Sequence, residues 1–105
     1  MEKIELFCAV LVLAGKPRFA VEDVVAEKRG DEYSCYVGGL GGDNFVQAPE
    51  LVGEVFSVGR KVFVFAEDRK DAIAGMYDYA FPRKIYIDDE EYVNFVFDKN
   101  FEAVK

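Results

Sequence analysis

The side chains of this chain that could take part in chemistry are its carboxylates, six tyrosines and two cysteines. The 105 residues include 20 Asp and Glu but no His, Thr or Trp, and the only serines are Ser34 and Ser57. Histidine is the usual proton carrier near neutral pH, and Ser, Thr and Cys are common nucleophiles. A chain so poor in these groups is predicted to be a binding protein with no catalytic residues.

The densest group of carboxylates is the run at residues 88–91, which a tyrosine flanks on each side. The run lacks the alternating spacing and central Gly of a calcium loop, and no two acids stand out as a glycosidase pair. Carboxylates with aromatic rings among them can imitate the phosphates and bases of a nucleic acid. We therefore predict a partner-binding site without metal or cofactor. Its primary residues are Asp88, Asp89, Glu90, Glu91, Tyr86 and Tyr92, and its secondary residues are Glu67, Asp68 and Asp71.

The overall charge indicates what kind of partner this site would bind. The net charge is −7, and the basic residues cluster only as pairs. The four pairs are at residues 28–29, 60–61, 69–70 and 83–84, and two of them, 28–29 and 69–70, lie beside carboxylates. Direct binding to nucleic acid or to an anionic membrane is therefore disfavoured. A protein with a basic surface, such as a nucleic-acid-handling complex, is the complementary partner.

The glycine-rich segment at residues 38–44 is the one low-complexity feature. Four glycines in five positions can expose backbone N–H groups, as phosphate-binding loops do. The next residues along the chain are neither the helix start of a dinucleotide fingerprint nor the Gly-Lys-Ser/Thr of a P-loop. A hairpin or crossover loop is favoured. The alternative is a small-ligand or nucleotide site formed by Gly38, Gly39, Gly41, Gly42, Asp43 and Asn44.

The two cysteines, Cys8 and Cys35, predict reduced core residues and a cytosolic protein. Two thiols are too few for a disulfide scaffold, and without His they cannot complete a four-ligand zinc site. The apolar run from Leu6 to Ala14 is far shorter than the roughly 20 residues that span a bilayer. Its flank has no net positive charge, which argues against a signal peptide. We expect a buried strand in a soluble, cytoplasmic protein.

The first half of the chain is predicted to form a three-stranded antiparallel meander. Residues 4–13 are rich in strand formers and end at a Gly-Lys-Pro break. Residues 18–28 form the next strand, and the slip in their apolar alternation suggests a bulge near Glu22 and Asp23. After a polar turn, residues 33–37 alternate back as the third strand.

The second half is predicted to contain the main helix. Residues 49–55 suggest a short helical turn opened by Pro49, and residues 60–66 a strand. A helix then begins at Glu67 and ends at Pro82. Its apolar stripe consists of Ala72, Ile73, Met76, Tyr77, Ala80 and Phe81.

A final hairpin is predicted from residues 83–87 and 92–97, with the acidic run at its tip. The whole chain, residues 1–105, is then a single α+β domain. It has a curved antiparallel sheet of about five to six strands with one main helix packed on it. An uncovered edge such as residues 92–97 could also pair with a second copy, so a homodimer or a homo-oligomeric assembly subunit remains an alternative.

The layout of several segments resembles that of small accessory proteins of phages and mobile elements. These segments are two long strands around Gly15-Lys16-Pro17, Ala26-Glu27-Lys28 before a Tyr-containing strand, residues 49–55, and residues 62–65 leading into 67–73. The resemblance implies a genomic context in which some small acidic proteins inhibit host defence nucleases, and it transfers no functional residue. The predicted function is therefore an inhibitor of the anti-CRISPR or anti-restriction type.

Overall fold

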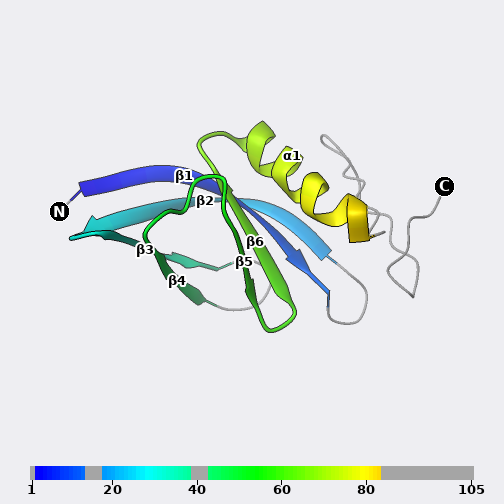
Figure 1. The fold of residues 1–105 in the computed structure, drawn as a ribbon, viewed down its shortest axis with the longest axis horizontal. Coiled ribbons are helices and arrows are strands. Elements are labelled where there is room, and N and C mark those ends of the chain that lie inside the picture. Colours follow the sequence, from blue (N-terminus) through cyan, green and yellow to red (C-terminus); the bar gives the residue numbers. More distant parts are fainter. Residues whose placement is uncertain (1, 14–17, 39–42, 84–105) are drawn as a thin grey trace.

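The computed structural model describes residues 2–13, 18–38 and 43–83, which form a curved sheet with one helix on it (Figure 1). This confirms the α+β prediction. The elements are β1 Glu2–Val12, β2 Arg18–Arg29, β3 Glu32–Val37, β4 Asn44–Ala48, β5 Val55–Val58, β6 Lys61–Ala66, α1 Arg69–Ala80 and a short 3₁₀ turn, Phe81–Arg83. The predicted hairpin beyond Arg83 lies outside the described residues.

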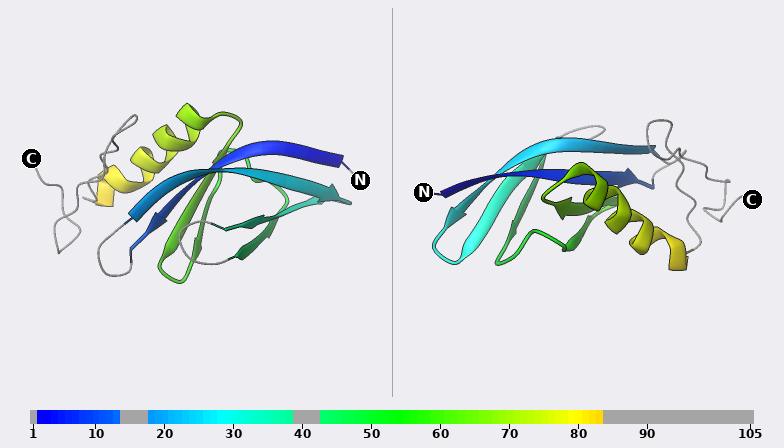
Figure 2. Two further views of the ribbon diagram at one scale, coloured as in Figure 1. Left: turned by 180° about the vertical axis from the view of Figure 1, so that it is seen from behind. Right: turned by 90° about the horizontal axis from the view of Figure 1, so that it is seen from above.

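All strand neighbours in the sheet are antiparallel, and the strand order is β4-β3-β2-β1-β6-β5. The predicted meander of β1, β2 and β3 is confirmed. The sheet curls strongly, so that β3 and β4 lie across from β5 and β6, and α1 crosses its outer surface (Figures 1 and 2). Within the described residues, β4 and β5 are the edges.

Strand β1 is buried on both faces, as its unbroken apolar run predicted. Leu6, Cys8 and Val10 belong to the inner core enclosed by the curved sheet. Ala9 and Leu11 point the other way, into the outer core beneath α1. Because alternate residues of a strand point to opposite faces, one strand contributes to both cores.

The bulge predicted near Glu22 is wrong. The register between β1 and β2 is continuous, and Glu22 pairs with Cys8 and Asp23 with Phe7. The apolar positions of β2 shift by one because different parts of the strand bury opposite faces. Phe19 and Val21 pack in the outer core, whereas Val24 and Ala26 pack in the inner core.

The helical turn predicted for residues 49–55 is also wrong. Residues 52–54 extend the β5 side of β6 beyond the last β5 pair: the Gly53 N–H donates to the Phe65 carbonyl at 2.9 Å, and Val52 forms a parallel bridge with Phe65. Gly53 has φ of 80°, a left-handed conformation that glycine adopts without strain. Leu51 is anchored in the inner core. Pairing with β6 and burial of Leu51 together outweigh the weak local preference for a helix.

Helix α1 begins two residues later than predicted because Asp68 is its N-cap. The Asp68 side-chain oxygen Oδ1 accepts a hydrogen bond from the Asp71 N–H at 2.9 Å, and the Asp68 carbonyl accepts one from the Ala72 N–H at 3.1 Å. The helix buries most of the predicted stripe, namely Ala72, Ile73, Met76 and Ala80. Pro82 lies two residues beyond its last residue, within the 3₁₀ turn.

Gly75 allows α1 to approach the sheet closely. A Cβ atom built at this position would lie 2.7 Å from Cγ1 of Val64, a buried residue of β6. Real Cβ atoms do not come so close to other heavy atoms, so either the helix or the strand would have to shift.

We expect Gly75→Ala to lower the free energy of unfolding by about 1–2 kcal/mol, because overpacking outweighs the better helix propensity of alanine. In a Val64→Ala background, where the clashing methyl is absent, the same change should raise stability. Denaturant unfolding of the four proteins measures this coupling. Stabilisation by Gly75→Ala in the wild-type background would contradict the close approach.

We expect Asp68→Ala to cost about 1 kcal/mol of unfolding free energy, since the Asp71 N–H loses its acceptor. Asp68→Ser should retain most of the stability, because the serine oxygen can also cap a helix. Thermal and denaturant unfolding provide the measurement, with Lys70→Ala as an exposed control on the same helical turn. Equal losses for the alanine and serine variants would rule out the capping role.

Candidate functional site

The primary predicted site lies outside the described residues. Tyr86, Tyr92 and the four acids between them therefore remain a prediction. Of the secondary residues, Asp68 is the helix cap, whereas Glu67 and Asp71 line a groove on the outer surface.

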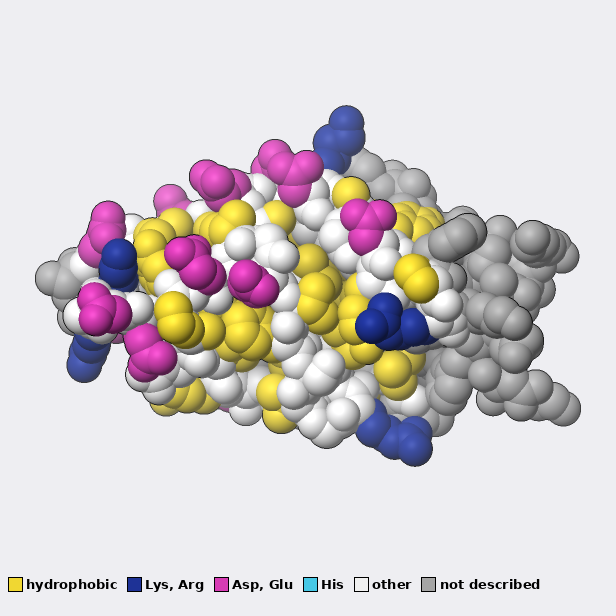
Figure 3. All heavy atoms as spheres, viewed as in Figure 1, with side chains coloured by type: hydrophobic (Ala, Val, Ile, Leu, Met, Phe, Trp, Pro, Cys, Tyr) yellow, Lys and Arg dark blue, Asp and Glu magenta, His cyan; other side chains and the backbone are white. Residues whose placement is uncertain are grey.

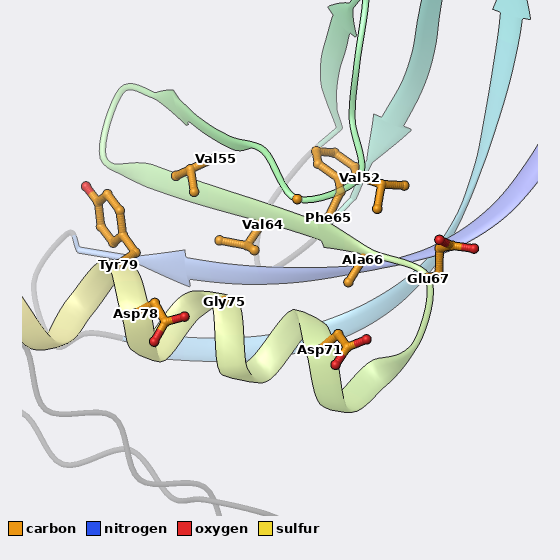
Figure 4. A pocket seen from close by; sticks show the side chains of 11 residues that line it. Val52, Val55, Val64, Phe65, Ala66, Glu67, Asp71, Gly75, Asp78 and Tyr79 are labelled. Carbon is orange, nitrogen blue, oxygen red and sulfur yellow. The ribbon is translucent and has the colours of Figure 1, made fainter.

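This groove lies between α1 and the β5–β6 hairpin, and its volume is about 480 Å³ (Figure 4). Its floor is the outer face of β6 around Val64 and Ala66. One wall is α1, and the other is formed by Val52, Gly53 and Val55. The volume is within the range of ordinary ligand pockets.

Three carboxylates line the groove: Glu67 at one end, and Asp71 and Asp78 along the helix. No Lys or Arg is among the lining residues. Within the described ranges, none of the three carboxylates forms an ion pair. Sequence reasoning missed Asp78, although its i, i+7 spacing from Asp71 places both on one stripe of the helix, which was a usable signal.

The groove also exposes apolar surface. Val52 and Val55 are 44% and 42% exposed. Tyr79 lies at the end opposite Glu67 (Figure 4). The guanidinium of Arg83 lies over the Tyr79 ring, 3.9 Å from the ring centroid. The groove is therefore lined by carboxylates from Glu67 to Asp78, with the Arg83 cation beside Tyr79 at one end.

The glycine-rich segment joins β3 to β4 as a hairpin, which is one of the two connections predicted for it. Asn44 Nδ2 donates to the Val37 carbonyl at 3.3 Å and so helps to close the hairpin. A Cβ at Gly38 would lie 3.6 Å from carboxylate oxygens of Asp43 and Glu22. Carboxylates at this end of the loop would repel an anionic ligand such as a nucleotide. Gly39, Gly41 and Gly42 lie outside the described residues.

A second exposed feature lies on the outer face of β3 and β4 and of the second half of β2. The rings of Tyr36 and Phe45 are a cross-strand pair 5.1 Å apart and are 68% and 50% exposed. Val25, on the same face of β2, is 53% exposed. The sequence patterns had indicated no role for these residues.

The thiols of Cys8 and Cys35 are free and buried in the inner core, although β2 separates their strands. Burial raises the pKa of Cys35 to about 11. Burial, followed by the nearby charges of Cys35 and Glu22, raises the pKa of Cys8 well above its ordinary value. Both thiols are therefore protonated at neutral pH and inert as nucleophiles.

Neither a metal cluster nor a membrane-crossing helix is found in the described part of the chain. No group of three or more His, Cys, Asp or Glu residues there is arranged to hold a metal ion. No helix among those residues has the length and apolar character needed to cross a membrane.

The raised pKa of Cys35 predicts how stability depends on pH. From about pH 9 to about pH 11 the unfolded chain releases this proton while the folded chain keeps it, so the free energy of unfolding falls as pH rises. Cys35→Ala removes this contribution. Urea unfolding at several pH values above about 8 should therefore show a steeper decline for the wild type than for the variant. Parallel curves would contradict the assignment.

We compared the chain with protein-family models, curated proteins and solved structures. None of these comparisons found a match.

Proposed function

We propose that this protein is a non-enzymatic binding protein that docks on the basic surface of a nucleic-acid-handling partner and competes there with the nucleic acid. The groove between α1 and the β5–β6 hairpin carries the proposal, because its three carboxylates face solvent without a neutralising cation among the lining residues. A surface of this kind attracts Lys and Arg side chains and repels phosphates.

The separation of polar and apolar residues supports binding over catalysis. Among the described residues no polar or charged side chain is buried, and both cores consist of apolar residues and thiols. The described carboxylates therefore lie at the surface, where they can meet a partner. On the face shown in Figure 3, acidic and hydrophobic side chains intermingle, whereas Lys and Arg lie mainly toward its margins.

The proposed biological setting is counter-defence by a phage or mobile element. An inhibitor of the anti-CRISPR or anti-restriction type needs neither catalysis nor a cofactor, since occupying the basic channel is sufficient. The layout resemblance of the sequence supports this setting, together with the net charge of −7.

The test is capture of partners from host lysate by the tagged protein at low and at high salt. We expect a nucleic-acid-binding protein to be retained at about 50 mM salt and released at about 500 mM, because exposed charges are screened beyond a few ångströms at high salt. The purified partner should then lose a labelled oligonucleotide as this protein is added. An unrelated protein of similar size and net charge is the control.

Two results would contradict the proposal. One is a retained partner whose bound oligonucleotide is not displaced. The other is displacement by the control protein at the same concentration, which would show that net charge alone is sufficient.

A further inference from the structure

We propose that the groove between α1 and the β5–β6 hairpin is the docking site for an extended basic segment of the partner, in which Lys or Arg residues alternate with apolar ones. This inference deepens the proposed function and rests on it. It assigns the contact to one place on the molecule and specifies the chemistry of the segment that binds there.

The groove has the dimensions of a short stretch of extended chain. Asp71 and Asp78 are seven residues apart on α1, which corresponds to about 10 Å along the helix axis. An extended chain rises about 3.3 Å per residue, so roughly three residues span the two acids. Glu67 lengthens the acidic stretch at one end (Figure 4).

The spacing of the carboxylates favours cationic side chains over a metal ion. Calcium requires oxygen ligands within about 2.6 Å of one centre, and acids two helical turns apart cannot supply them to a single ion. Lys and Arg have long flexible arms, and successive cations along a segment can each meet a different carboxylate. A nucleic acid would bring further negative charge to the same place and is disfavoured.

The apolar surface of the groove determines which residues accompany the cations. Val52 and Val55 form an exposed wall, and Val64 lies at the floor between this wall and Gly75. Aliphatic side chains can be buried against these valines, and so can the methylene stems of Lys and Arg. A segment that alternates basic and apolar residues places the two kinds on opposite sides of an extended backbone.

The position of Gly75 explains why the acids are close to this floor. Asp71 and Asp78 lie four residues before and three residues after the point at which α1 makes its closest approach to Val64. Arg83, stacked on Tyr79, adds positive charge at the far end. The cations of the bound segment are therefore expected nearer to Glu67 and Asp71 than to Tyr79.

A designed peptide tests the site without knowledge of the partner. The probe is a fluorescein-labelled heptapeptide of alternating Lys and Val, and the negative probe replaces Lys by Glu. Fluorescence anisotropy at low salt measures the affinity. Backbone amide NMR of the protein should show shifts concentrated in α1 and the β5–β6 hairpin.

Two triple variants with equal charge changes separate the groove from net charge. Glu67→Gln/Asp71→Asn/Asp78→Asn removes the groove acids, whereas Glu2→Gln/Asp23→Asn/Asp31→Asn removes three exposed acids elsewhere. We expect the groove variant to weaken binding of the Lys/Val peptide about tenfold and the control by less than about twofold. Val55→Lys, which places a cation on the apolar wall, should also weaken binding.

Equal weakening by the two triple variants, or no binding of the peptide to the wild type, would overturn the inference. The same variants in the oligonucleotide competition assay keep the two proposals apart. Full competition by the groove variant would overturn the docking site and leave the proposed function standing. No competition by the wild-type protein would overturn the proposed function itself.

Discussion

The structure depends on the burial of β1 on both of its faces. Residues such as Leu6 and Val10 fill the inside of the curved sheet, while Ala9 and Leu11 support α1 on the outside. The strand also hydrogen-bonds to β2 on one side and β6 on the other. Both cores and the central backbone pairing of the sheet therefore meet in one segment, and a polar substitution there would disturb all of them.

The position of α1 results from this arrangement and creates the groove. The helix packs over β1 and β6 but leaves β5 uncovered, so a hollow remains between the helix and the edge of the sheet. Because Gly75 has no side chain, the helix can lie close to Val64. Acids that would otherwise be ordinary surface residues of a helix are thereby placed beside apolar strand surface, a combination typical of interfaces with polar rims.

Among the described residues, the apolar cores and the acidic surface are formed by different side chains. The cores are apolar throughout the described part of the chain, and the acidic side chains there lie at the surface. Asp68 differs from the other surface acids because it stabilises the helix. Sequence reasoning grouped it with the predicted binding acids, whereas its side-chain oxygen caps α1. Glu67 and Asp71, close to it in the sequence, line the groove. Acids close together in the sequence thus occupy different environments according to where the helix begins.

Sequence patterns were enough to predict the fold class, the meander, and the main helix with most of its buried stripe. These features arise from local apolar periodicity and composition, which β1 and α1 display strongly. Other features depend on contacts between distant segments. The apolar alternation of β2 shifts because the strand packs first on the outer core and then on the inner core. Residues 52–54 lie along β6 because the backbone of Phe65, beyond the last β5 pair, offers hydrogen bonds. The groove joins Glu67, Asp71 and Asp78 to Val52 and Val55, and the curvature of the sheet and the close approach at Gly75 bring these distant residues together.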